Sequence, residues 1–170
     1  PLLVGTLASA SNAKELQHNA PLYSHAAAAL SKFAKGHRES QKAIAEAGAI
    51  PSLVTILGAQ LQANAGAQLQ ANAAECLGHL AAHHPENQAA IARTGAIPPL
   101  CTLVREGSPQ AREASAGALR FLTSDNKPNK DTVAKLGGLE PLIALIVAGT
   151  TEGALEHASG ALLALTSRHT

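Results

Sequence analysis

The sequence has very few aromatic residues. Among its 170 residues there is no tryptophan and no methionine, one tyrosine and two phenylalanines. A compact core of this size usually holds several large aromatic side chains, because each of them buries a large apolar area. Hydrophobic residues nevertheless make up 46% of the chain, with alanine and leucine prominent among them. This composition favours thin layers of closely packed helices over one thick core.

An excess of charge of one sign and long apolar runs are also missing. The formal net charge is +1, whereas a protein that binds nucleic acid electrostatically presents a clustered basic face. A mild basic cluster consists of Lys32, Lys35, Arg38 and Lys42. Glu39 and Glu46 interleave with it, so we interpret it as a solvated helix face. The longest strongly apolar stretch, Leu142–Ala148, is far shorter than the ~20 residues that span a bilayer.

Cysteine is scarce as well, with Cys76 and Cys101 each inside an apolar phrase. Free cysteine often behaves as a small buried hydrophobe, which favours a reducing compartment over a disulfide framework. We therefore expect a soluble intracellular protein, cytoplasmic or nuclear, without membrane insertion and without nucleic acid as a partner.

What the sequence does contain is one phrase in three copies. The copies are Gly48-Ala49-Ile50-Pro51, Gly95-Ala96-Ile97-Pro98 and Gly137-Gly138-Leu139-Glu140. Their glycines lie 47 and 42 residues apart. Self-similarity at such a period is typical of a helical solenoid, in which stacked repeats share one continuous core. Solenoids present extended binding surfaces, so the phrase favours a binding protein.

Each repeat is expected to contain a short helix and two longer ones. The short helix should cover 40–46, 87–93 and 129–135, with Ser40, Asn87 and Asn129 as N-caps. The glycine of each phrase can take the left-handed conformation that ends a helix, and a proline suits the start of the next helix. The third helix is marked by leucines 47, 42 and 43 residues apart, namely Leu30, Leu77, Leu119 and Leu162.

This order of elements resembles the armadillo repeat: a short helix, Gly-x-Ile-Pro-x-Leu, a long helix, then Ala-Leu-x-x-Leu. HEAT repeats, the nearest alternative, usually lack the separate short helix and its glycine. The resemblance covers nearly the whole chain and implies an all-α fold, a right-handed α-solenoid of about four repeats with three helices each. The expected units are 1–36, 37–83, 84–125 and 126–170.

The first expected unit is incomplete. Pro1-Leu2-Leu3-Val4 aligns with Pro51-Ser52-Leu53-Val54, the start of a second helix. The first unit therefore lacks the short helix that precedes the second helix in the other units. Terminal repeats of an intact solenoid carry polar outer faces, and neither end of this chain has one. We therefore expect an excerpt of a longer array, with neighbouring repeats or subunits covering the exposed ends.

The resemblance also predicts where a partner would bind. In armadillo proteins the third helices line a concave groove for extended peptides, and nuclear-import adaptors carry a ladder of Asn and Trp there. The Asn positions of that ladder correspond to Lys32, His79, Phe121 and Ala164. The Trp positions correspond to Ala28, Glu75, Gly117 and Gly160. Because no ladder residue matches, a nuclear-import adaptor is the least favoured function.

The groove positions nevertheless give a candidate partner-binding set. It consists of Lys32, Glu75, His79, Glu113, Phe121 and Glu156. Glu113 and Glu156 lie one helical turn before Trp positions, on the same face. Phe121 is the large apolar member and the candidate anchor, with packing against the neighbouring repeat as the alternative. For the charged members the alternative is simple solvation.

Catalytic and metal-binding patterns are weak. Glu75, His79 and His83 share one helix face by spacing and could hold zinc. All three come from the end of one helix, however, so we favour the interpretation that the histidines face solvent. The sequence has no nucleophile elbow, phosphate-binding loop or paired CxxC. We therefore predict no enzyme, no metal and no cofactor.

The predicted function is a protein–protein interaction scaffold that presents an extended groove to a partner protein or peptide. The alternative is the substrate-recognition region of a U-box-type ubiquitin ligase. Residues 106–113 followed by Ala116-Gly117-Ala118-Leu119 resemble the armadillo arrays of such ligases.

One octapeptide, Gly-Ala-Gln-Leu-Gln-Ala-Asn-Ala, occurs twice in succession, at 58–65 and 66–73. We expect it to extend a helix or lengthen the connection between the second and third helices of its unit. It is either a protruding contact element or a neutral duplication that a surface loop tolerates.

Overall fold

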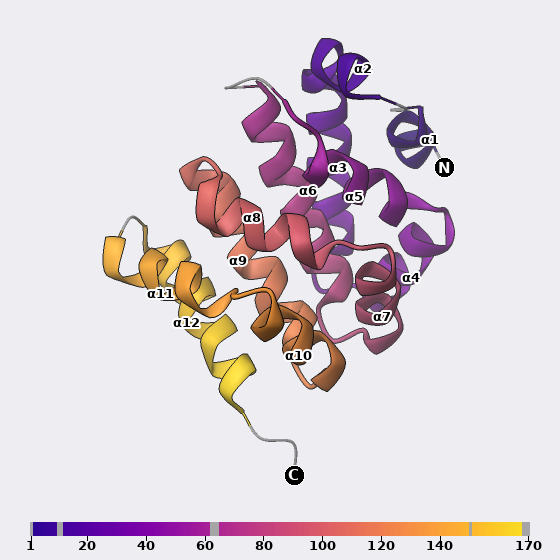
Figure 1. The fold of residues 1–170 in the computed structure, drawn as a ribbon. Helices are drawn as coiled ribbons and strands as arrows, with labels where there is room; N and C mark the ends of the chain where they lie inside the picture. Colours follow the sequence, from indigo (N-terminus) through magenta and orange to yellow (C-terminus); the bar gives the residue numbers. More distant parts are fainter. Residues whose placement is uncertain (1, 10–11, 62–64, 150, 168–170) are drawn as a thin grey trace.

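The computed structural model describes residues 2–9, 12–61, 65–149 and 151–167. Within these residues the chain forms twelve helices and no strand. Figure 1 shows the helices stacked one after another along the molecule, with α1 and α12 on opposite sides of it. The predicted all-α solenoid is confirmed.

The helices fall into three rows. The short helices are α4 (Arg38–Glu46), α7 (Pro85–Arg93) and α10 (Lys127–Lys135). The second helices are α1 (Leu2–Ala8), α5 (Ala49–Gly58), α8 (Ile97–Glu106) and α11 (Leu139–Ala148). The third helices are α3 (Ala20–Ala34), α6 (Ala65–Ala81), α9 (Pro109–Thr123) and α12 (Glu152–Thr166).

One further helix, α2 (Ala13–His18), precedes α3 and was not predicted. The side chain of Asn12 accepts a hydrogen bond from the backbone N–H of Glu15 at 2.9 Å and so caps it.

The third helices pack side by side in chain order, α3 on α6, α6 on α9 and α9 on α12. Small residues allow this close packing. A Cβ atom on Gly78 of α6 would lie 3.1 Å from Cα of Ala118 in α9, so the two helices approach almost backbone to backbone. Leucines fill the space behind them, and Leu77 and Leu119 are almost completely buried.

The glycines of the repeated phrase adopt the expected conformation. Gly48, Gly95 and Gly137 have φ values of 89°, 87° and 68°, which L-residues with a side chain rarely adopt. Each glycine therefore reverses the chain between a short helix and the second helix that follows it.

The predicted N-caps of the short helices are wrong. These helices begin two residues earlier, and His37, His84 and Asn126 occupy the N-cap positions. In α7, Pro85 takes the first helical position, where its missing N–H costs no hydrogen bond. Ser40, Asn87 and Asn129 therefore lie inside their helices.

Inside their helices, the two asparagines tie α7 and α10 to the preceding backbone. Asn87 Nδ2 donates to the carbonyl oxygen of Leu80 at 2.9 Å, and Asn129 Nδ2 to that of Leu122 at 2.8 Å.

A buried polar side chain also links each short helix to the end of its third helix. Gln41 Nε2 donates to the carbonyl oxygens of His79 and Ala82, at 2.7 and 3.2 Å. Gln88 donates in the same way to Phe121 and Ser124, at 2.8 and 3.2 Å. In the last unit, Lys130 Nζ donates to the carbonyl of Ser167 at 3.1 Å. These bonds satisfy carbonyls that a helix end leaves without an intrahelical partner.

The duplicated octapeptide takes two different structures. Its second copy lies within α6, which has 17 residues where the other third helices have 15. Its first copy ends α5 and begins the connection to α6; residues 62–64 lie outside the described residues. Gln70 donates to the carbonyls of Leu57 and Ala59, at 3.2 and 3.0 Å. The duplication therefore lengthens both the helix and the connection.

In the described part of the chain, every helix is too short or too polar to cross a membrane.

Candidate functional site

Two hollows contain most of the predicted partner-binding residues, one between third helices and one between α6, α9, α4 and the residues that follow α3. The first, which we call the acidic hollow, has a volume of about 250 Å³ and lies between α6, α9 and α12. Its lining residues are Gln68, Ala71, Asn72, Glu75, Gln110, Glu113, Ala114 and His157. The second, the histidine hollow, has a volume of about 350 Å³. It is lined by Lys35, Gly36, Arg38, Gln41, His79, Ala82, His83 and Phe121.

In the acidic hollow, Glu75 and Glu113 come from neighbouring helices, and no lysine or arginine lies among the lining residues. Glu75 is exposed. Glu113 is half-buried and accepts a hydrogen bond from Thr151 Oγ1 at 2.6 Å. Its carboxylate lies against Gly153, where a Cβ atom would collide with it. Thr151 thus holds the Glu113 carboxylate in place and Gly153 leaves room for it, while Glu75 is exposed to solvent.

Two of the positions that correspond to tryptophan in the ladder are glycines, Gly117 and Gly160. In both cases a side chain of the neighbouring third helix occupies the space above the glycine. Gly117 leaves space for the ring of His157, which would lie 3.3 Å from a Cβ atom there. Gly160 lies beneath Arg120, whose Cδ would be 2.6 Å from a Cβ atom. The glycines therefore let polar side chains cross from one third helix to the next.

Arg120 contacts two of the candidate residues and was not part of the sequence prediction. Its guanidinium pairs with the carboxylate of Glu156 at 2.8 Å and lies 5.6 Å from the ring centroid of Phe121. The hydrogen bond from Arg120 lowers the pKa of Glu156. The sequence could have indicated this residue, because Arg120 directly precedes the candidate Phe121 in the phrase Ala118-Leu119-Arg120-Phe121.

In the histidine hollow, His79 is half-buried and is tied to the preceding helix. Its Nδ1 atom lies 2.8 Å from Ser31 Oγ. Burial lowers the pKa of His79, and the positive charge of Lys35 lowers it further, whereas Glu75 opposes the shift. The ring therefore favours the neutral form in the folded protein and links α3 to α6.

Phe121 lines the histidine hollow from α9 and also packs partly against the hydrophobic core. Its role as an anchor for a partner stays a prediction. Lys32 is exposed on α3 and belongs to neither hollow.

No group of three His, Cys, Asp or Glu side chains within the described ranges is arranged to hold a metal ion. Cys76 and Cys101 are buried free thiols. Burial raises the pKa of both, that of Cys101 to about 11 although Arg105 opposes the shift. Both thiols are therefore protonated near neutral pH and are poor nucleophiles.

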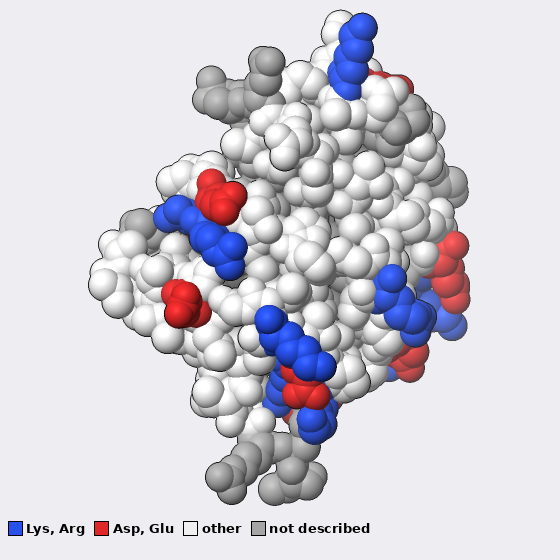
Figure 2. All heavy atoms as spheres, viewed as in Figure 1, with Lys and Arg blue, Asp and Glu red and all other residues white. Residues whose placement is uncertain are grey.

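Figure 2 shows the face of the molecule that is seen in Figure 1. Its charged side chains lie mainly toward the margins, and the centre carries few of them.

Comparison with known proteins identifies the repeat. Residues 84–124 match the family model of the Armadillo/beta-catenin-like repeat. No curated protein sequence matches the chain.

The structure is similar to designed armadillo repeat proteins. One of them, in complex with the peptide (KR)4, matches with a TM-score of 0.80 and 23% identity over 98% of this chain and 64% of its own. Another matches with a TM-score of 0.79 and 26% identity, over 96% of this chain and 63% of its own. The chain thus spans less than two thirds of the length of these two proteins. Residues 84–124 thus match the armadillo repeat, and the chain as a whole shares the fold of the armadillo-repeat solenoids.

Proposed function

We propose that the chain is a protein-interaction scaffold that binds an extended peptide along its third helices. We further propose that the acidic hollow receives a lysine or arginine side chain of that peptide. The observation that carries this proposal is that Glu75 and Glu113 line the same hollow, and that no lysine or arginine lines it with them. The proposal assigns binding, and no catalysis, to these residues.

Three features support a basic ligand at this place. Carboxylates of α6 and α9 face one hollow, and a charge-assisted hydrogen bond from an ammonium or guanidinium group is roughly twice as strong as a neutral one. Glu113 is already held by Thr151, which reduces the ordering cost of binding. A protein of the same fold is known in complex with the alternating basic peptide (KR)4.

The remaining candidate residues take different parts in this proposal. Phe121 and His79 line the neighbouring hollow and would contact an apolar or polar side chain of the same peptide. Glu156 is paired with Arg120, so it contributes less to a basic ligand than Glu75 does. Lys32 lies beyond both hollows and would contact only a longer peptide.

The test is a fluorescence-anisotropy titration of labelled (KR)4 with the chain at low salt. We expect Glu75→Gln and Glu113→Gln each to weaken binding about tenfold, which corresponds to ~1.4 kcal/mol. The control is Glu140→Gln, which removes an exposed carboxylate from the second helix α11. If all three variants bind equally well, the acidic hollow is not the site.

The anchor is tested separately. Phe121→Ala should weaken binding of a peptide that carries an apolar residue beside its basic residues, while circular dichroism shows that the helices remain. Unchanged affinity in that titration would assign Phe121 to packing alone. The ubiquitin-ligase function stays the alternative prediction from the sequence, and nuclear import stays the least favoured one.

A further inference from the structure

The histidine hollow differs from the acidic hollow in the sign of the charges that line it. Two cationic side chains, Lys35 and Arg38, lie among its lining residues, and no aspartate or glutamate does. The acidic hollow shows the opposite pattern, with Glu75 and Glu113 and without lysine or arginine. The two hollows therefore offer places of opposite charge to a single ligand.

Both cations come from the turn that joins α3 to α4. Lys35 directly follows α3, Arg38 is the first residue of α4, and both are exposed. Within the described ranges Lys35 forms no ion pair, and Arg38 lies 3.8 Å from Glu86. An exposed ion pair contributes at most ~1 kcal/mol. A carboxylate of a ligand can therefore compete with Glu86 for the Arg38 guanidinium.

The repeat pattern does not require a cation at either place. The 47-residue interval between the motif leucines of α3 and α6 relates Lys35 to Ala82 and Arg38 to Pro85. One repeat later, these two places thus hold no charge. The positive charge is a particular feature of the histidine hollow.

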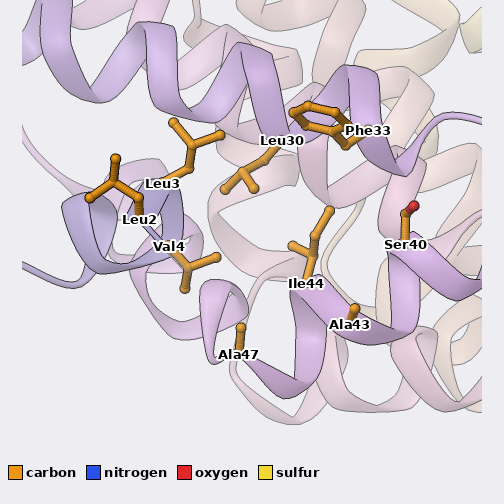
Figure 3. A pocket seen from close by; sticks show the side chains of 9 residues that line it. All are labelled: Leu2, Leu3, Val4, Leu30, Phe33, Ser40, Ala43, Ile44 and Ala47. Carbon is orange, nitrogen blue, oxygen red and sulfur yellow. The ribbon is translucent and has the colours of Figure 1, made fainter.

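Uncharged side chains of the same two helices gather at a different hollow, which Figure 3 shows. Phe33 of α3 and Ile44 of α4 line it together with apolar side chains of α1. It shares no lining residue with the histidine hollow. The helices α3 and α4 therefore present apolar side chains to one hollow, whereas Lys35 and Arg38 line the other.

Two imidazole rings and one phenyl ring complete the histidine hollow. His79 is held by Ser31, whose Oγ lies 2.8 Å from its Nδ1 atom, and His83 supplies the second imidazole. Gln41 is buried and donates to the carbonyl oxygen of His79 at 2.7 Å. Phe121 contributes an apolar wall from α9. The hollow thus combines cations for a carboxylate with an aromatic ring for the methylene groups that carry it.

The separation of the two hollows sets the spacing of charges on a ligand. Glu75 and His79 lie four residues apart on the same face of α6, which corresponds to about 6 Å along the helix. In an extended peptide, alternate residues are about 6.6 Å apart and their side chains point to the same side. A peptide that lies along α6 can therefore place one side chain in each hollow when these side chains are two residues apart.

We propose that the histidine hollow binds the carboxylate of an acidic residue of the extended peptide, two positions from the basic residue that enters the acidic hollow. Lys35 and Arg38 bind the carboxylate, with charge-assisted hydrogen bonds, and its methylene groups pack against Phe121. The ligand class is a peptide in which a basic and an acidic residue are separated by one residue. This assignment rests on the proposed function, because the basic residue occupies the acidic hollow.

The test is an NMR titration of the ¹⁵N-labelled chain at low salt with three capped peptides. Glu-Ala-Lys-Ala-Glu presents a carboxylate two residues from lysine in either direction of the peptide. Gln-Ala-Lys-Ala-Gln lacks the carboxylates. Ala-Glu-Lys-Glu-Ala has the composition of the first peptide, but its carboxylates are adjacent to lysine, where an extended chain points them to the opposite side. We expect the first peptide to bind about fivefold more tightly than each of the other two.

Lys35→Glu distinguishes the histidine hollow from the general charge of the molecule. We expect this variant to lose the preference for the first peptide over the second, because the carboxylate then meets a like charge. The control is Lys135→Glu, which makes the same change of charge at an exposed position of α10, away from both hollows. It should keep the fivefold preference. Because the preference is a ratio within one protein, a small loss of folded protein does not change it.

The results distinguish this assignment from the proposed function. Equal affinity for the three peptides, with Glu75→Gln weakening all of them, would overturn the carboxylate site and leave the basic site in place. A fourth peptide, Glu-Ala-Gln-Ala-Glu, tests the reverse. If it binds as tightly as the first, and Lys35→Glu but not Glu75→Gln weakens both, the carboxylate site is supported and the basic site is wrong. If no peptide binds saturably, both are wrong.

Discussion

Ser115 illustrates how much the packing of third helices depends on single atoms. It stands four residues before the motif leucine of α9, and the other three units have Ala26, Ala73 and Ala158 in this place. All four residues are buried. Within the described ranges, Ser115 Oγ has no hydrogen-bond partner, although burying an unpaired hydroxyl is costly.

Replacing this serine should therefore stabilise the fold. We expect Ser115→Ala to raise the free energy of unfolding by about 1 kcal/mol, since a buried unpaired polar group is removed. Urea denaturation followed by circular dichroism measures the change. Ser159→Ala, at an exposed position of α12, corrects for the helix propensity of alanine. A gain no larger than that of the control would show that Ser115 has a partner in solution.

His79 makes the stability of the α3–α6 contact depend on pH. Burial lowers its pKa from the ordinary value of 6.5, so the unfolded chain takes up a proton at a higher pH than the folded chain does. Stability is therefore complete above about pH 6.5 and decreases as the pH falls toward the folded pKa. We expect wild type to lose more thermal stability than His79→Gln between pH 7.5 and 5.5. Parallel melting curves for the two proteins would contradict this assignment.

At the scale of helices, the sequence predicted the elements better than their ends. The spacing of glycines and leucines was sufficient for the three rows, because each apolar stripe needs a neighbour to cover it. The predicted N-caps were wrong because asparagine is a common N-cap residue, so its type alone gave no reason to place Asn87 and Asn129 inside a helix. Only in the packed structure do the carbonyls of Leu80 and Leu122 lie close enough to accept their hydrogen bonds. Helix α2 was missed because it belongs to no repeated phrase.

Gln88 connects two such elements and should contribute strongly to stability. Its amide donates to two carbonyls at the end of α9, and its Oε1 accepts a hydrogen bond from Asn126 at 3.1 Å. Gln88→Ala leaves these buried groups unpaired, and we expect it to lower the free energy of unfolding by roughly 2 kcal/mol. Gln110→Ala, at an exposed position of α9, is the matched control. Equal losses in the two variants would mean that the link from α7 to α9 is unimportant.

At the scale of the whole molecule, the sequence predicted which helices carry the candidate residues, and it did not predict the contacts between their side chains. The sequence assigned Glu75, Glu113, His79 and Phe121 to the third helices, and the structure groups the first two in one hollow and the last two in another; their part in binding stays a prediction. The sequence could not show that Arg120 pairs with Glu156 across 36 residues, because that contact depends on how closely Gly160 lets two helices approach. Nor could it show that His79 bonds to Ser31.

The central claim is that a basic peptide binds along the third helices at the acidic hollow. The most direct measurement is an NMR titration of the ¹⁵N-labelled chain with (KR)4, in which backbone amide shifts locate the contact. We predict saturable shifts in α6, α9 and α12, largest around Glu75, Glu113 and His157, which weaken as salt is added. Shifts concentrated in the second helices α5, α8 and α11, or no saturable shift at low salt, would contradict the account.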